Sequence, residues 1–156
     1  MLWTVQAHKD IEHMETPYVV KLHRYTPLAA PLPVFTFQHP AEAKGPPDNS
    51  RYLSLEFKRN ELPQATCHGF AGYFEAQLYG DVWLSTHPET HTPNMFSWFP
   101  VYFPLAEPLV IPQSRHIQAH WWRCVSAHEV WYEWAVSEPV TSHIHNPLGR
   151  SYKVGL

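Results

Sequence analysis

Residues 130–136 read Val-Trp-Tyr-Glu-Trp-Ala-Val, and this stretch decides the fold class of the chain. Side chains alternate between the two faces of an extended chain, so every second residue shares a face. One face would carry Val130, Tyr132, Trp134 and Val136, and the other would carry Trp131, Glu133 and Ala135. Aromatic and β-branched residues with this period are typical of a strand that covers a core on one side.

The same period of two recurs along the chain. Three further long alternations lie at residues 52–57, 70–79 and 117–124. Shorter strand candidates lie at residues 18–23, 34–38, 82–85, 97–103 and 109–111. Only residues 1–16 have a helical pattern, and residues 39–51 are expected to form a long exposed excursion. About nine or ten short strands predict an all-β fold, a single antiparallel β-barrel or sandwich-like domain.

The composition excludes several classes of protein. The chain of 156 residues is 44% hydrophobic with a net charge of −3, which is unlike a disordered chain. Its 16 prolines interrupt helices too often for a helical bundle. Its six glycines contain no Gly-x-Gly pattern, which disfavours a nucleotide-binding α/β fold. With 11 basic and 14 acidic residues and no long run of either, no nucleic-acid partner is predicted.

The cysteines and the N-terminus bear on the cellular compartment. Cys67 and Cys124 are too few for a disulfide framework and are expected to be small buried hydrophobic residues. The N-terminus has no basic stretch followed by an apolar run, so it does not resemble a signal peptide. Both features predict a reducing compartment, cytosolic or nuclear.

Residues 95–111 are nearly all apolar and almost long enough to span a bilayer. Prolines recur within or beside this stretch at positions 100, 104, 108 and 112. Because proline removes a backbone donor and clashes with the preceding turn, neither a helix nor a membrane span is predicted here. The stretch is expected to form an edge strand, or a strand broken by turns.

The 12 histidines raise the question of a metal site. His143 and His145 are the best pair, because residues two apart share a strand face. No third ligand is identifiable, so no metal is predicted. The chain also has no Gly-x-Ser-x-Gly motif, and its 14 carboxylates are scattered, so no catalytic residue is predicted within it.

Residues 96–99 read Phe-Ser-Trp-Phe and place three aromatic rings within four positions. Aromatic faces attract cations, and a guanidinium group stacks on them well. An exposed Trp could equally stack on a sugar ring. A place in the β-core is the commoner explanation for large aromatic residues. Composition alone leaves these alternatives open.

The same stretch is part of a longer motif that resembles a known family. The motif consists of Pro-Glu-Thr-His at 88–91, Pro93, and Met-Phe-Ser-Trp-Phe-Pro at 95–100. Three other stretches agree with it: His-Gly-Phe-Ala-Gly-Tyr-Phe at 68–74 with Leu78-Tyr79, Val-Trp-Tyr-Glu-Trp at 130–134, and His-Asn-Pro at 145–147 with Gly-Arg-Ser-Tyr at 149–152 and Gly155-Leu156. In this order the motifs resemble the C-terminal β-barrel of the type II, symmetric protein arginine N-methyltransferase family. The resemblance covers residues 17–156 as one barrel domain and leaves residues 1–16 as an unmatched N-terminal segment.

The family transfers methyl groups from S-adenosylmethionine to protein arginine and produces symmetric dimethylarginine. The resemblance implies that this chain is only the last part of such an enzyme. The S-adenosylmethionine site and a catalytic pair of glutamates would both lie upstream, outside this chain. By itself the chain is therefore expected to bind no S-adenosylmethionine and to be inactive.

The resemblance also assigns a substrate-binding role to Phe96, Ser97, Trp98 and Phe99, which would form one wall of the substrate arginine channel. Trp98 would stack on the guanidinium, and Phe99 would border the channel through its backbone or its ring. Ser97 is small where asymmetric-dimethylating relatives carry His, which would leave room to methylate the second nitrogen.

The partners implied are arginine-containing proteins such as histones and splicing proteins, a second copy of the enzyme, and a WD-repeat protein bound through a missing N-terminal domain. The implied location is cytoplasmic and nuclear. Two alternatives remain: a stand-alone carbohydrate-binding module that presents aromatic platforms, and a protein-interaction module whose only activity is self-association.

Overall fold

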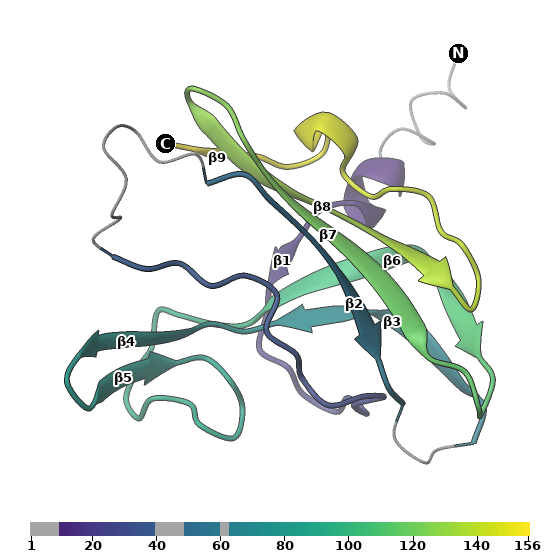
Figure 1. The fold of residues 1–156 in the computed structure, drawn as a ribbon, viewed down its shortest axis with the longest axis horizontal. Helices are drawn as coiled ribbons and strands as arrows, with labels where there is room; N and C mark the ends of the chain where they lie inside the picture. The colour runs from purple at the N-terminus through teal and green to yellow at the C-terminus, as the bar shows by residue number, and fades with distance from the viewer. Residues whose placement is uncertain (1–9, 40–48, 60–62) are drawn as a thin grey trace.

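The computed structural model describes residues 10–39, 49–59 and 63–156, and these residues form an almost entirely β-structure (Figure 1). Its strands are β1 Tyr18–Val19, β2 Arg51–Phe57, β3 Ala65–Gly72, β4 Glu75–Tyr79, β5 Val82–Ser85, β6 Val101–Ile111, β7 Ile117–Val125, β8 Glu129–Glu138 and β9 Val154–Gly155. A short 3-10 turn, η1, covers Pro147–Gly149, and residues 10–14 are helical. No helix in the described part of the chain is long and apolar enough to cross a membrane.

Two antiparallel sheets enclose the core. One sheet has the strand order β1-β6-β3 and the other β2-β7-β8-β9, while β4 and β5 form a separate hairpin. Buried residues from β6, such as Leu105 and Ile111, pack with Trp121 of β7 and Trp134 of β8. The all-β, sandwich-like prediction is confirmed, and the described strands form three separate sheets rather than one closed barrel.

The alternation that predicted β7 and β8 matches their burial. Ile117, Ala119 and Trp121 are buried on β7, and Trp134 and Val136 are buried on β8. Trp121 lies directly opposite Trp134 in the antiparallel register, and both rings contact Phe103 of β6 edge to face in the core. Cross-strand pairs of this kind stabilise a sheet beyond the area that they bury.

Strand β6 explains how a proline-rich stretch can lie in a sheet. β1 pairs only with Val101 and Tyr102, so within the described residues most of β6 has one open edge. Pairing with β3 passes from Gly69 opposite Pro104 to Cys67 opposite Leu109, which leaves residues 105–108 in a bulge. Prolines are tolerated at open edges and bulges because no ladder donor is needed there. An edge strand or a strand broken by turns was expected, and this prediction is wrong: β6 is one continuous strand that lies between β1 and β3, although β1 covers only its first two residues.

Residues 70–79 were expected to form one strand, and this prediction is wrong. The chain leaves β3 after Gly72 and starts a different ladder at Glu75. Phe74 turns away from β6 because its N–H donates to Thr86 Oγ1 at 2.9 Å and its carbonyl accepts from the Thr86 N–H at 2.9 Å. Alternation continues through the break, so periodicity could not reveal it.

Four shorter predictions also need correction. Residues 34–38 form no strand, the first strand ends at Val19, and residues 97–100 precede β6 instead of opening it. Residues 109–111 belong to the same strand as residue 101. The expected excursion at 39–51 lies mostly outside the described residues, as does the first part of the 1–16 segment.

Candidate functional site

The aromatic loop, residues 96–99, follows a turn that is pinned by hydroxyl groups. Thr92 and Ser85 exchange two hydrogen bonds, since the Thr92 N–H donates to the Ser85 carbonyl at 3.0 Å and the Ser85 N–H donates to Thr92 Oγ1 at 2.9 Å. The Thr90 hydroxyl donates to Glu75 Oε1 at 3.0 Å. Ser85 is buried, so its bonds to Thr92 are shielded from water, whereas the Thr90–Glu75 bond is exposed. They fix the start of the loop to the β4–β5 hairpin.

The loop itself exposes its rings. Phe96 is 81% exposed and Trp98 is 56% exposed. Ser97 is also exposed, Phe99 is half-buried and Pro100 is buried. Leaving one large apolar side chain in water forgoes roughly 1.5–3 kcal/mol of burial free energy. Clustered exposed rings of this kind mark a binding surface.

Trp98 is held by an edge-to-face contact with Phe74, with ring centroids 5.1 Å apart and planes at 64°. Phe74 is in turn fixed through its backbone to Thr86. This chain of contacts orients the indole while more than half of the residue stays exposed. Trp98 therefore forms a supported aromatic surface that can accept a flat cation.

Phe99 has a different environment. Lys21 Nζ lies 5.0 Å from the centroid of its ring, within the range of a cation–π contact. The next residue, Pro100, accepts a hydrogen bond from the Val20 N–H at 3.0 Å, which ties the end of the loop to the segment after β1. The ring of Phe99 is thus already engaged, whereas the ring of Trp98 is open to a ligand.

The aromatic loop lies outside the two hollows described next. One open hollow of about 470 Å³ is lined by Arg51, Tyr52, Trp122 and Arg123, on the outer side of β2 and β7. Another of about 370 Å³ is lined by Glu15, His143 and Arg150. Neither hollow includes the aromatic loop, so the loop can supply only one wall of an enclosed site.

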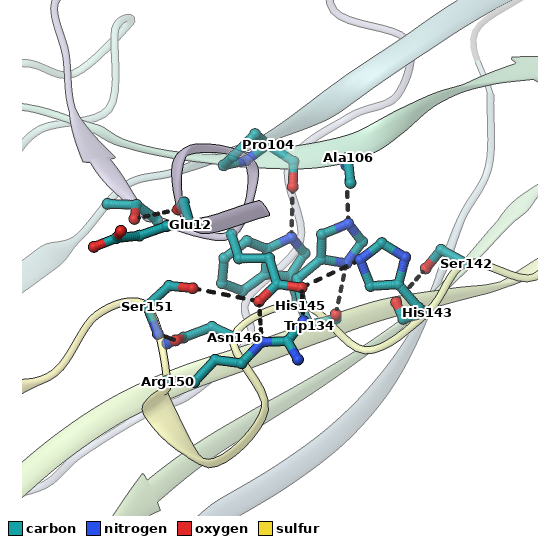
Figure 2. Close-up of polar contacts among 12 residues, drawn as sticks. Glu12, Pro104, Ala106, Trp134, Ser142, His143, His145, Asn146, Arg150 and Ser151 are labelled. Atoms are coloured by element: carbon teal, nitrogen blue, oxygen red, sulfur yellow. Dashed lines mark hydrogen bonds and ion pairs between the residues drawn. The ribbon is translucent and has the colours of Figure 1, made fainter. Parts of the chain in front are cut away.

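A second group of side chains, which we call the polar network, consists of Glu15, His143, His145, Asn146 and Arg150. Figure 2 shows His143, His145, Asn146 and Arg150 gathered beside Trp134. The buried Glu15 carboxylate accepts two hydrogen bonds from Arg150, at 2.6 and 2.8 Å, and lies 3.4 Å from His143 Nε2. Burial by itself raises the pKa of Glu15. The hydrogen bond and the charge of Arg150 outweigh that effect, so the pKa lies below its usual value.

His145 uses both ring nitrogens. Nε2 accepts a hydrogen bond from the Ala106 N–H at 3.0 Å, so this nitrogen carries no proton. Nδ1 lies 3.1 Å from the Trp134 carbonyl, to which the neutral ring donates. Burial, followed by the charge of His143, lowers the pKa of His145 to about 4. The neutral imidazole thereby gives the N–H group of Ala106, in the β6 bulge, a hydrogen-bond acceptor.

Asn146 completes the polar network with four hydrogen bonds. Its Nδ2 donates to the carbonyls of Tyr132 and Tyr152 at 3.0 and 2.9 Å. Its Oδ1 accepts from the N–H groups of Ser151 and Tyr152 at 2.9 and 3.0 Å. Its φ of 52° lies in the left-handed region, which Asn tolerates better than most residues. The network is therefore an internal brace between the two sheets and the C-terminal segment.

These contacts account for the side chains of His143 and His145, the pair that was considered as a metal site. The His143 and His145 rings stack with centroids 4.3 Å apart, and both nitrogens of His145 already have hydrogen-bond partners. In the described part of the chain, no group of three or more His, Cys, Asp or Glu side chains could hold a metal ion. Cys67 is buried as expected and Cys124 is half-buried. Burial raises the pKa of both thiols, that of Cys124 to about 11 with a contribution from Glu133.

Sequence reasoning missed three supporting residues. Phe74 and Thr86 orient Trp98, but Phe74 was assigned to the interior of a continuous strand. Glu15 was placed in an unmatched segment, and its partner Arg150 lies 135 positions away. A carboxylate just before the first strand and an arginine near the C-terminus form the only sequence signal of that contact, and it is a weak one.

A family model described as the PRMT5 oligomerisation domain matches residues 1–154. The chain belongs to this family. Its relatives include protein arginine N-methyltransferase 5 of Oryza sativa subsp. indica, which is 55% identical over 97% of this chain. The enzyme of that name from Xenopus laevis is 51% identical over 91% of the chain. Protein arginine N-methyltransferase skb1 of Schizosaccharomyces pombe is 30% identical over 99% of the chain.

As a member of the PRMT5 oligomerisation domain family, the chain spans 23% of the length of the rice relative and 22% of the frog relative. The family match begins at residue 1 and thus includes the segment 1–16, for which no resemblance was expected. Glu15 of the polar network lies within that segment. The boundary between residues 16 and 17 stays a prediction.

Proposed function

We propose that this chain forms the C-terminal domain of a protein arginine N-methyltransferase and supplies one wall of the channel that holds the substrate arginine. The single observation that carries the proposal is Trp98. Its ring is oriented from one side by Phe74 and is more than half exposed, in a loop that lines neither of the two hollows described above. A guanidinium that stacks on this ring would be held in a fixed plane by a wall that another domain must complete.

The geometry of methyl transfer gives a reason for such a wall. The attacking nitrogen must lie in line with the bond that breaks, so fixing the guanidinium plane lowers the entropic part of the barrier. Trp98 would provide that orientation. Phe99 would border the channel mainly through its backbone, because its ring is engaged with Lys21. Ser97 would leave space beside the guanidinium, which favours methylation of both nitrogens and hence symmetric dimethylarginine.

S-adenosylmethionine, which would supply the methyl group, does not fit the part of this chain that the structure describes. The six glycines of the sequence contain no Gly-x-Gly loop, and the described strands pair in antiparallel fashion, unlike the parallel sheet that a dinucleotide-type fold uses. We therefore assign the cofactor and the catalytic carboxylates to upstream parts of the full-length enzyme. The isolated chain is expected to be inactive.

Further parts of the proposal concern partners and location. The description of the matching family favours a homo-oligomer. Arginine-containing proteins, including histones and splicing proteins, would be the substrates, and a WD-repeat partner would bind outside this chain. The location would be cytoplasmic and nuclear, in agreement with the small number of cysteines.

A chimera tests the role of Trp98. The matching region of the rice relative is replaced by this chain, and the Trp98→Ala variant is compared with the unmodified chimera by steady-state kinetics and by mass analysis of the methylated products. Loss of guanidinium orientation is expected to lower kcat/KM by roughly 100-fold. Tyr52→Ala is the matched control, because Tyr52 is also 56% exposed but lies on β2.

The control chimera is expected to keep its turnover, and all folded variants should elute at the same oligomeric size. Turnover of the Trp98→Ala chimera equal to that of the unmodified chimera would remove Trp98 from the channel. Asymmetric dimethylarginine as the product of the unmodified chimera would contradict the role of Ser97.

A further inference from the structure

The β4–β5 hairpin presents apolar side chains to solvent beside the aromatic loop. Tyr79 is 86% exposed and Trp83 is 54% exposed, and Leu78 and Val82 are similarly exposed. The hairpin extends away from the two larger sheets (Figure 1), and β4 and β5 pair with no other described strand. A two-stranded hairpin gains little by itself from exposed rings. Its apolar surface therefore needs an occupant.

The hairpin is continuous with the proposed arginine site. Ser85, at the end of β5, and Glu75, at the start of β4, both contact the Thr90 hydroxyl in the turn that leads to the aromatic loop. Phe74, the residue before β4, carries the edge-to-face contact with Trp98. If the arginine of a substrate chain stacks on Trp98, the residues that flank this arginine would thus lie next to the β4–β5 hairpin.

The charges favour a basic occupant. Residues 60–114 contain no Lys or Arg, and they contain five carboxylates: Glu61, Glu75, Asp81, Glu89 and Glu107. All 11 basic residues of the chain lie before or after this stretch. Lys21 lies against Phe99 and partly offsets the charge at the loop. The hairpin itself holds Glu75 and Asp81 and no cation, so it attracts positively charged chains.

We propose that the β4–β5 hairpin is the docking surface for the segment of the substrate protein that flanks the target arginine. The segment would be extended and basic. Its apolar parts and its Lys or Arg stems would cover Tyr79 and Trp83, and its charges would face Asp81 and Glu89. An extended chain can pair with the open edge of a strand, and a cation can bind the face of an exposed aromatic ring. This inference rests on the proposed function of Trp98, since that residue sets the position of the arginine.

The first experiment uses the chimera described above with two peptides that share a central arginine. One is short, Gly-Arg-Gly, and the other carries long flanks that contain lysine. The double variant Tyr79→Ser/Trp83→Ser is expected to raise the ratio of the long-peptide KM to the short-peptide KM roughly tenfold, through lost flank contacts. Tyr52→Ser, on the outer side of β2, is the matched control and should leave that ratio unchanged.

The second experiment tests the charges with Asp81→Asn/Glu89→Gln. A long peptide with glutamine in place of lysine is compared with the lysine peptide at low and high salt. The variant is expected to reduce the preference for the lysine peptide and its salt dependence, because exposed charges are screened. An unchanged preference would overturn the proposed basic occupant.

Two further results would also overturn the proposal. An unchanged KM ratio in the Tyr79→Ser/Trp83→Ser chimera would show that substrate does not touch the hairpin. Loss of assembly, seen as a change of oligomeric size, would show that another domain or a second copy covers it. Failure of the proposed function gives a different pattern, because Trp98→Ala would then leave the kinetics of both peptides unaltered while the effect of the hairpin variant could still be measured.

Discussion

The polar network and the aromatic loop follow opposite rules of burial. Glu15, His145 and Asn146 are polar and fully buried, whereas Phe96 and Trp98 are apolar and exposed. Burying a polar group costs free energy unless it is hydrogen-bonded, and exposing an aromatic ring forgoes burial. Each region therefore departs from the usual distribution of residues between core and surface.

The difference between the two regions lies in how each departure is compensated. In the polar network, hydrogen bonds within the chain compensate it: Asn146 makes four, and His145 uses both nitrogens. In the aromatic loop, contacts within the chain involve Phe74 and Lys21 and leave most of Phe96 exposed. The first arrangement stabilises the domain, and the second keeps a surface available for a partner.

The largest effect on stability is expected at Asn146. Asn146→Ala removes four part-buried hydrogen bonds to backbone groups and strains a left-handed position. We expect a loss of about 3–5 kcal/mol in the free energy of unfolding, measured by urea denaturation. Asn146→Gly keeps the backbone conformation accessible and separates the two causes. A loss below about 1 kcal/mol in both variants would show that the network does not brace the domain.

A slightly smaller effect is expected from pH, through His145. Its pKa is about 4 in the folded chain against 6.5 when unperturbed, so the unfolded chain binds more protons between these values. Stability should therefore fall as the pH is lowered from 6.5 to 4, by roughly 3 kcal/mol from this group. The lowered pKa of Glu15 adds to acid sensitivity only below its usual value of 4.5.

Urea unfolding at several pH values measures this dependence. A His145→Gln variant cannot titrate at this position, so its stability should change less between pH 6.5 and 4 than that of the unmodified chain. His128→Gln, in an exposed loop, serves as the control and should keep the pH dependence. If the free energy of unfolding changed equally with pH in the His145→Gln variant and the unmodified chain, this result would contradict a buried neutral imidazole.

The smallest effect on stability is expected at Trp98. Its main described contact is the edge-to-face pair with Phe74, so Trp98→Ala should lower the free energy of unfolding by about 1 kcal/mol or less. Trp134→Ala is the reference, because that ring is fully buried and its loss should cost about 3–5 kcal/mol. Thermal and urea unfolding give both values. Similar losses in the two variants would make Trp98 a core residue and remove the contrast between the regions.

Strand β7 could be predicted from the sequence because Ile117, Ala119 and Trp121 on one face are buried and the residues between them are not. On β8 the sequence alternates equally clearly, but Ala135 is buried as well as Trp134 and Val136 on the other face. The break at Phe74 could not be predicted, since it depends on hydrogen bonds to Thr86, a residue 12 positions away. The candidate site was partly predictable. The Phe-Ser-Trp-Phe motif and its family resemblance directed attention to residues 96–99, but not to the residues that support them.

Local features of the chain were sufficient to establish an all-β class, the absence of a helix at residues 95–111 and membership of a methyltransferase-related family. These features depend on neighbours along the chain, such as alternation, proline spacing and motif order. Burial depends on the folded chain, because the same aromatic residue can lie in the core, as Trp134 does, or on the surface, as Trp98 does. Only the folded chain brings Glu15 to Arg150 and joins the hairpin to the aromatic loop, since both contacts unite residues that are distant in sequence.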